Sequence, residues 1–153
     1  MDRFASTHAP KPGKPCAFCE IAAGRLPARL VLETEACLAL LDRSPLLIGH
    51  VLLIPRAHVV TLPEADDATL TGLAFALRSL TAALPEALEA EGTFVAQNNV
   101  VSQSVPHLHF HVVPRTRGDK LFAYNLTWKR VRYGSEAQMD EVAGRIRAAL
   151  AAG

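Results

Sequence analysis

The sequence predicts an α+β fold in which a mainly antiparallel sheet carries one long helix and is followed by a C-terminal helix. Several short strand-like runs are interrupted by a single long helical pattern, whereas a parallel sheet would need regular alternation of strands and helices. The chain has 153 residues, half of them hydrophobic, which suffices for one domain with a substantial core.

The expected strands are short apolar runs bounded by turn residues. They lie at residues 29–33, 37–42, 50–55, 93–98 and 107–114. Thr34 and Glu35 mark a turn between the first two, and residues 44–50 form a loop before the third. The segment 115–132 is basic and irregular.

The long helix is recognised by leucines that recur at steps of three and four residues. This stripe consists of Leu70, Leu73, Leu77, Leu80 and Leu84. Pro63 and Glu64 are expected to open the helix, and Pro85 to interrupt it.

Two further helices are expected, one near each end of the chain. Residues 16–24 form a short helical segment that Gly24 closes. The last helix begins at Ser135, with Gln138 completing a capping box. Its buried stripe is Met139, Val142, Ile146 and Leu150.

Composition limits the classes of partner and compartment. A net charge of +1 argues against nucleic-acid or membrane binding through charge alone, and no apolar run approaches the roughly 20 residues of a membrane span. Residues 1–15 resemble a flexible tail rather than a signal peptide, and residues 16–153 form the single expected domain. Three cysteines, an odd number, favour a reducing, cytoplasmic environment.

Three of the six histidines alternate in the stretch PHLHFHVVPR at residues 106–115. Because side chains alternate along a strand, His107, His109 and His111 share one face at spacings of about 6–7 Å. The opposite face, expected to pack under the long helix, carries Leu108, Phe110 and Val112. An exposed polar row gives no reason to repeat one ionisable residue, so a reactive site is favoured.

Two kinds of chemistry fit this row. One is a zinc hydrolase, and the other is metal-free phosphoryl transfer in which an imidazole attacks phosphorus. The preceding loop, AQNNVVSQSVP, contains no Asp or Glu to activate a metal-bound water. It offers uncharged partners for phosphoryl oxygens instead, namely Asn98, Asn99, Ser102, Gln103 and Ser104. The phosphoryl interpretation is therefore favoured.

The run SQSVPHLHFHVVPR resembles the signature of the histidine triad (HIT) family, and CAFCEIAAGRLPA and CLALLDRSPLLIGHVLLIPRAH match upstream elements in order. The resemblance covers roughly residues 16–116. It implies a HIT-like fold, a homodimer, and hydrolysis or nucleotidyl transfer at the α-phosphate of a small-molecule nucleotide, such as a nucleoside phosphoramidate or a dinucleoside polyphosphate. No catalytic cofactor is implied.

The resemblance also assigns roles by position. His109 corresponds to the nucleophile that becomes nucleotidylated, and His111 to the residue that contacts phosphate or the leaving group. His50 matches a histidine near the phosphates. Gln103 and Ser104 match a pair that binds phosphate oxygens or donates toward the leaving group.

The nucleoside would be bound by Asp42 and an apolar wall. Asp42 matches the residue that holds the ribose hydroxyls, since a carboxylate accepts from both. The base would lie against Phe18, Ile21, Leu41 and Leu52, for which plain core packing is an equal alternative. The loop lacks the family's glycines, so it must take another shape, and whether Asn98 or Asn99 faces the ligand stays open.

Cys16 and Cys19 form a C-x-x-C pair, whereas Cys37 is expected to be a small buried hydrophobe. A redox pair, two unrelated buried thiols and half of a zinc site are the alternatives. Some proteins resembling this one complete a structural zinc site with histidines at the positions of His58 and His107. Four protein ligands would leave no open position for catalytic water.

The sequence leaves open both the role of the basic segment and the choice between an enzyme and a binding protein. The basic side chains form a solvated surface or reach the anionic part of the substrate, while Trp128 stacks on a base or fills a dimer interface. These cations are Arg115, Arg117, Lys120, Lys129, Arg130 and Arg132. A nucleotide-binding adaptor with little catalysis is the alternative to the enzyme.

Overall fold

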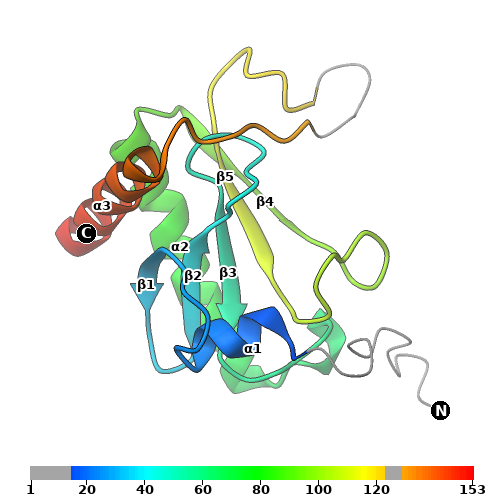
Figure 1. Cartoon of the computed structure of the whole chain (residues 1–153). Helices are drawn as coiled ribbons and strands as arrows, with labels where there is room; N and C mark the ends of the chain where they lie inside the picture. Colours follow the sequence, from blue (N-terminus) through cyan, green and yellow to red (C-terminus); the bar gives the residue numbers. More distant parts are fainter. Residues whose placement is uncertain (1–14, 123–128) are drawn as a thin grey trace.

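The computed structural model describes residues 15–122 and 129–153, and its elements confirm the predicted α+β fold (Figure 1). The helices are α1 (Ala17–Ala22), α2 (Asp67–Leu88) and α3 (Glu136–Ala152), with a 3-10 turn at Leu62–Glu64. The strands are β1 (Leu30–Glu33), β2 (Cys37–Leu41), β3 (Val51–Pro55), β4 (Gly92–Gln97) and β5 (Phe110–Arg115). Most of the expected tail, and Trp128, lie outside the described residues.

The strands form a 5-stranded sheet in the order β1-β2-β3-β5-β4. Every neighbouring pair is antiparallel, as the sequence predicted. β3 lies in the centre beside β5, although α2 and β4 separate them in the chain (Figure 1). In this register Leu52 is opposite His111, which brings the histidine row next to the strand that follows His50.

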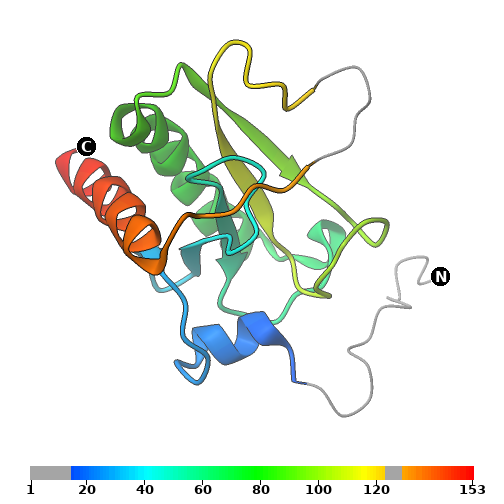
Figure 2. The ribbon, with the colours of Figure 1, turned by 45° about the horizontal axis from the view of Figure 1, so that its top comes forward.

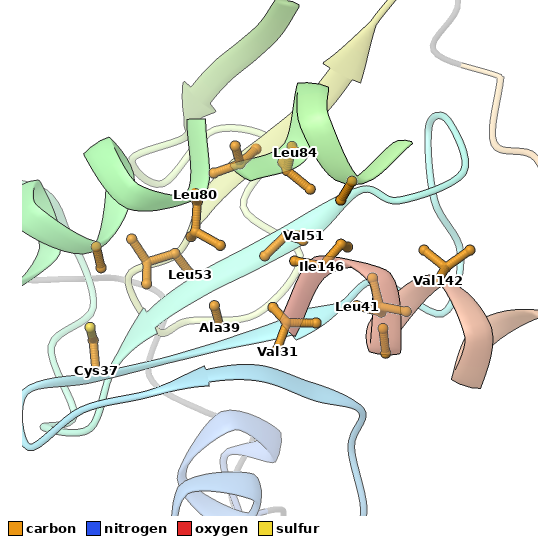
Figure 3. Close-up of a cluster of buried hydrophobic side chains, with 14 of the residues drawn as sticks. Val31, Cys37, Ala39, Leu41, Val51, Leu53, Leu80, Leu84, Val142 and Ile146 are labelled. Carbon is orange, nitrogen blue, oxygen red and sulfur yellow. The ribbon is translucent and has the colours of Figure 1, made fainter. Parts of the chain in front are cut away.

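The face of the sheet covered by α2 and α3 holds the main core. Leu80 and Leu84 of α2 and Ile146 of α3 pack against the apolar side chains of the central strands (Figure 3). Each fully buried leucine or isoleucine contributes about 1.5–3 kcal/mol relative to an exposed one. Leu108 and Val112 belong to this core and Phe110 packs against it, so the alternation predicted around the histidines is confirmed.

The opposite face of the sheet carries α1 (Figures 1 and 2). Phe18 of α1 packs there in a smaller apolar cluster. The other buried members of this cluster are Leu38, Leu40, Leu52 and Ile54. Gly24 follows α1 with φ 71 and its N–H bonds the carbonyl of Ile21, as expected for a glycine just beyond a helix.

The expected limits of α2 were wrong at both ends. Pro63 and Glu64 belong to the separate 3-10 turn, and α2 begins at Asp67 behind Asp66, whose Oδ1 accepts from the Thr69 N–H at 2.7 Å. The helix also continues through Pro85 to Leu88. A proline removes one backbone donor, while burial of Leu84 and Ala87 on the same face keeps the last turn in place.

β5 is shorter than predicted, because it begins at Phe110 and leaves His107 and His109 before the strand. The Leu108 N–H donates to the Val59 carbonyl at 2.6 Å and not to a neighbouring strand of the sheet. At α3, the Ser135 side chain accepts from the Gln138 N–H as expected. Gln138 itself reaches the Gly134 N–H at 2.6 Å, one residue earlier than a capping box requires.

Candidate active site

A cavity of about 320 Å³ opens between α1, the β2–β3 face of the sheet and the histidine row. It is lined by Phe18, Ile21, Leu40, Leu41, Asp42, Arg43, Ser44, Leu52, Ser104, Val105, His109, His111 and Arg130. The structure therefore brings together the four residues expected to wall a base, the Asp42 carboxylate, Ser104 and two triad histidines. Leu41 belongs to the core on the opposite face of the sheet, whereas Leu40, which also lines the cavity, belongs to the cluster around Phe18.

His109 is held in one tautomer by the backbone. Its Nδ1–H donates to the carbonyl oxygen of His107 at 2.7 Å, which leaves the lone pair on Nε2. The side chain is 3% exposed, and burial lowers its pKa below the ordinary value of 6.5. A neutral imidazole with a free Nε2 lone pair in a cavity is a nucleophile ready to act near pH 7.

His50 and His111 form a second ordered pair. The Leu46 N–H donates to His50 Nδ1 at 3.1 Å, so the proton of the neutral His50 ring lies on Nε2. That Nε2–H donates to His111 Nδ1 at 2.9 Å. His111 consequently presents its own Nε2 as an N–H donor, which complements the lone pair on His109.

Both rings of this pair are neutral at pH 7. Burial, followed by repulsion from His111 and Arg130, lowers the pKa of His50 to about 3. Burial, followed by the charges of His109 and Arg130, lowers the pKa of His111 to about 4. The 3.4 Å approach of His50 Nδ1 to Asp42 is therefore not an ion pair.

The loop before the triad uses its amides to bind its own backbone. Gln103 donates from Nε2 to the Val60 carbonyl at 2.6 Å and accepts from the Val100 N–H at 3.0 Å. Asn99 Oδ1 accepts from the Leu62 N–H at 2.8 Å. Gln103, Asn99 and Asn98 are not among the described residues that line the cavity.

The loop before the triad lacks glycines, and two of its residues take backbone angles that glycine usually adopts. Val100 and Ser102 adopt positive φ angles of 68° and 61°. Such angles are uncommon for residues other than glycine and strained for a β-branched side chain, so the loop takes the alternative shape that the sequence predicted.

Arg130 is a cavity residue that the sequence did not single out from its basic segment. Its Nη1 donates to Asp42 Oδ2 at 2.8 Å, and the other Asp42 oxygen accepts from the Ser44 N–H at 2.8 Å. Arg43 was also missed. Arg43 directly follows Asp42 in the chain. Arg130 lies close to Asp42 only because the segment after residue 128 crosses the loop that follows β2, which local sequence patterns do not reveal.

The four residues expected to bind zinc come together beside the cavity. The ligand atoms of Cys16, Cys19, His58 and His107 all lie within 4.8 Å of one another. Cys19 Sγ is 3.2 Å from His58 Nδ1, and Cys16 Sγ is 3.5 Å from His107 Nδ1. This set of two sulfurs and two nitrogens fits tetrahedral zinc.

The tautomer of His107 supports that fit. Its Nε2–H donates to the Pro55 carbonyl at 2.9 Å, which leaves the Nδ1 lone pair directed at the thiols. Without a cation, burial and the neighbouring Cys16 raise the pKa of Cys19 to about 11. A divalent metal would reverse this effect by binding the thiolates.

The sequence and the fold are shared with known proteins. Residues 23–118 match the model of the HIT domain. The chain belongs to the HIT family. Of the described residues, no helix of this HIT protein is long and apolar enough to cross a membrane.

Relatives of this HIT protein include proteins with named activities. It is 34% identical to adenosine 5′-monophosphoramidase hnt1 of Schizosaccharomyces pombe over 86% of this chain and 98% of that one. It is 32% identical to adenylylsulfatase HINT3 of Arabidopsis thaliana over 71% of this chain and 56% of the relative. An uncharacterised HIT-like protein of Methanocaldococcus jannaschii is 37% identical over 68% and 81% of the two chains.

Solved structures show the same fold. A zinc-bound histidine triad protein from Mycobacterium smegmatis superposes with a TM-score of 0.77 at 36% identity, covering 90% of this chain and 94% of that one. A hypothetical histidine triad nucleotide-binding protein from Sulfolobus tokodaii gives a TM-score of 0.78 at 29% identity, covering 90% of this chain and 93% of that one.

Proposed function

We propose that this HIT protein hydrolyses nucleoside 5′-phosphate derivatives at the α-phosphorus through a covalent nucleotidyl group on His109. The observation that carries the proposal is the hydrogen bond from His109 Nδ1 to the His107 carbonyl at 2.7 Å, which leaves Nε2 as the only nucleophilic nitrogen of the ring. His109 lines the cavity that also holds Asp42 and the apolar wall.

In the first step, His109 Nε2 attacks phosphorus and a P–N bond forms while the bond to the leaving group breaks. His111 presents Nε2–H in the same cavity, so it hydrogen-bonds the leaving group, and an amine leaving group takes its proton from solvent. Water then displaces His109 from phosphorus: the P–N bond breaks with its electron pair on Nε2, and the proton of that water goes to solvent. The Leu46 N–H and His50 keep His111 in the tautomer that this cycle starts from.

The rest of the cavity suits a nucleoside. Phe18 stands with its ring edge-on to His109, at a centroid distance of 5.4 Å, and forms part of the base wall. Asp42 accepts the ribose hydroxyls, and Ser104 contacts phosphate oxygens. Adenosine phosphoramidate is the first substrate to test, because a named phosphoramidase matches most of this chain; dinucleoside polyphosphates are the second.

The test is detection of the covalent adduct. Wild-type protein, His109→Ala and His111→Ala are incubated with adenosine phosphoramidate or diadenosine polyphosphate, quenched in base and weighed by mass spectrometry. We expect an adenylyl adduct that accumulates in His111→Ala and is missing in His109→Ala. Nucleotide binding with neither adduct nor turnover in any protein would favour the adaptor alternative.

We also propose that Cys16, Cys19, His58 and His107 hold a structural zinc ion. The zinc-bound neighbour and the clustered ligand atoms support this assignment. The second cluster of possible ligands, Asp42, His50 and His111, fits a metal poorly, because the Leu46 N–H already occupies His50 Nδ1.

Metal analysis of protein purified without added zinc tests the assignment, with Cys16→Ser as the comparison. One zinc per chain in the parent and a clear loss in the variant are expected; a metal-free parent refutes the site. A catalytic zinc would instead be revealed by chelators that abolish turnover while the fold persists.

The homodimer is likewise proposed. β4 is an edge strand of the sheet, and Val95 on it is 40% exposed. Such an edge is a surface on which a second copy can pair. Light scattering coupled to size exclusion should give twice the chain mass.

A further inference from the structure

The Arg130 guanidinium is anchored through one nitrogen only. Nη1 donates both to Asp42 Oδ2 and to the Ser44 carbonyl oxygen. A guanidinium carries N–H groups on each of its nitrogens. Among the residues that the structure describes, Nε and Nη2 of Arg130 have no hydrogen-bond partner, so this pair of donors is available.

The available donors lie at the reaction site. Arg130 lines the same cavity as His109 and His111. Its charge, after burial, helps to lower the pKa values of His50 and His111, which agrees with a position near these rings. The donors therefore belong to the same cavity as His111, the histidine that we propose faces the leaving group.

The hydrogen bond from Arg130 leaves Asp42 able to bind the ribose hydroxyls. Asp42 accepts one bond at each oxygen, from Ser44 N–H and from Arg130. A carboxylate has further lone pairs on both oxygens, so the ribose hydroxyls still find acceptors. Asp42 can thus bind the nucleoside and orient Arg130 at the same time.

We propose that Arg130 is a specificity-determining residue whose Nε and Nη2 bind an oxyanion of the leaving group. The parallel N–H donors of a guanidinium match two oxygens of a sulfate or phosphate, whereas a neutral amine has no oxygens to accept these two hydrogen bonds. The inference rests on the proposed function and says which of its substrates Arg130 would favour: nucleoside 5′-phosphates joined to sulfate or phosphate as mixed anhydrides.

The reaction step balances without a further reactant. His109 Nε2 forms the P–N bond, and the bridging P–O bond breaks with its electron pair on the departing sulfate or phosphate. Arg130 stabilises the charge that develops there. Water then replaces His109 on phosphorus and releases the nucleoside monophosphate.

A binding experiment tests Arg130 independently of turnover. The ratio of dissociation constants for AMP and for adenosine 5′-(α,β-methylene)diphosphate is measured without added divalent cations, since the β-phosphate of this uncleavable analogue occupies the leaving-group position. Wild-type protein should bind the analogue at least about tenfold more tightly than AMP, as a charge-assisted pair contributes. The ratio should approach one in Arg130→Ala and be intermediate in Arg130→Lys.

Arg132→Ala is the matched control, because it removes the same charge from the same segment outside the nucleotide cavity. It should keep the wild-type ratio. A ratio in Arg130→Ala equal to that of wild type, or an equal change in Arg132→Ala, overturns the inference. Thermal melting of each variant verifies that it is folded.

Kinetics then identify the source of the oxyanion. Adenosine phosphoramidate, adenylyl sulfate and diadenosine tetraphosphate share the adenylyl group and differ in the leaving group. Arg130→Ala should lower kcat/KM about tenfold to a hundredfold for one or both anhydrides and less than about threefold for the phosphoramidate. A loss restricted to one anhydride names sulfate or phosphate as the ligand.

Equal losses on all three substrates would overturn the inference, because Arg130 would then serve the shared nucleotide. If wild-type protein turns over none of them and forms no adduct, the proposed function fails. The binding ratio still decides on Arg130 in that case.

Discussion

Lowering the pH from 7 to 5 should destabilise this protein through two buried histidines. The pKa values of His50 and His111 in the folded state are about 3 and about 4, against 6.5 in the unfolded chain. Between pH 6.5 and about 4 the unfolded state therefore binds protons that the native state does not, and stability falls as the pH falls.

The size of the effect follows from linkage. Each pH unit below 6.5 removes about 1.4 kcal/mol per histidine, so at pH 5 each ring has lost about 2 kcal/mol and the pair about 4 kcal/mol. Carboxylates of ordinary pKa titrate mostly below this window. Burial lowers the pKa values of His107 and His109 as well, which adds to the loss with the same sign.

Urea unfolding at several pH values between 7 and 5 measures the slope. The double variant His50→Asn/His111→Asn keeps a hydrogen-bonding side chain at both positions and removes both titrations, so its free energy of unfolding should depend on pH much less steeply. Equal slopes in the variant and the wild type would show that these rings are not held neutral by burial.

Further changes test individual parts of the fold. Gly49→Ala should cost about 2–4 kcal/mol by thermal or urea unfolding, because φ is 91° and an added Cβ would lie 2.2 Å from Leu88 Cδ1; Gly24→Ala, at φ 71° with open space around it, should cost only about 1 kcal/mol. A comparable loss at both glycines would contradict the steric argument. Pro85→Ala should stabilise the protein by about 1 kcal/mol, since it restores an N–H that can bond the Thr81 carbonyl; a destabilised variant would show that the proline is favourable where it stands. Chelation of zinc should lower the melting temperature by more than about 5 °C, and unchanged melting of zinc-depleted protein would exclude a structural role.

Local patterns predicted most of the fold. Apolar runs located the strands, the leucine stripe located α2, and the alternation around His109 correctly assigned Leu108 and Val112 to the helix side. The errors were at boundaries. Whether a helix passes a proline depends on what buries its last turn, and burial of Leu84 against the sheet is a tertiary contact.

The sequence by itself determined which reactive groups exist and which of them share a face. The triad and the C-x-x-C pair are readable because their chemistry depends on residue type and short spacing. The resemblance attached a family to them and added Asp42.

Only the tertiary structure decided how these groups are protonated and what else reaches them. The tautomer of His109 depends on the carbonyl of His107, and that of His111 depends on Leu46 through His50. Arg130 reaches Asp42 across 88 positions of sequence. Hydrogen bonds and charges act over a few ångströms in space, so a pattern that records distance along the chain cannot predict them.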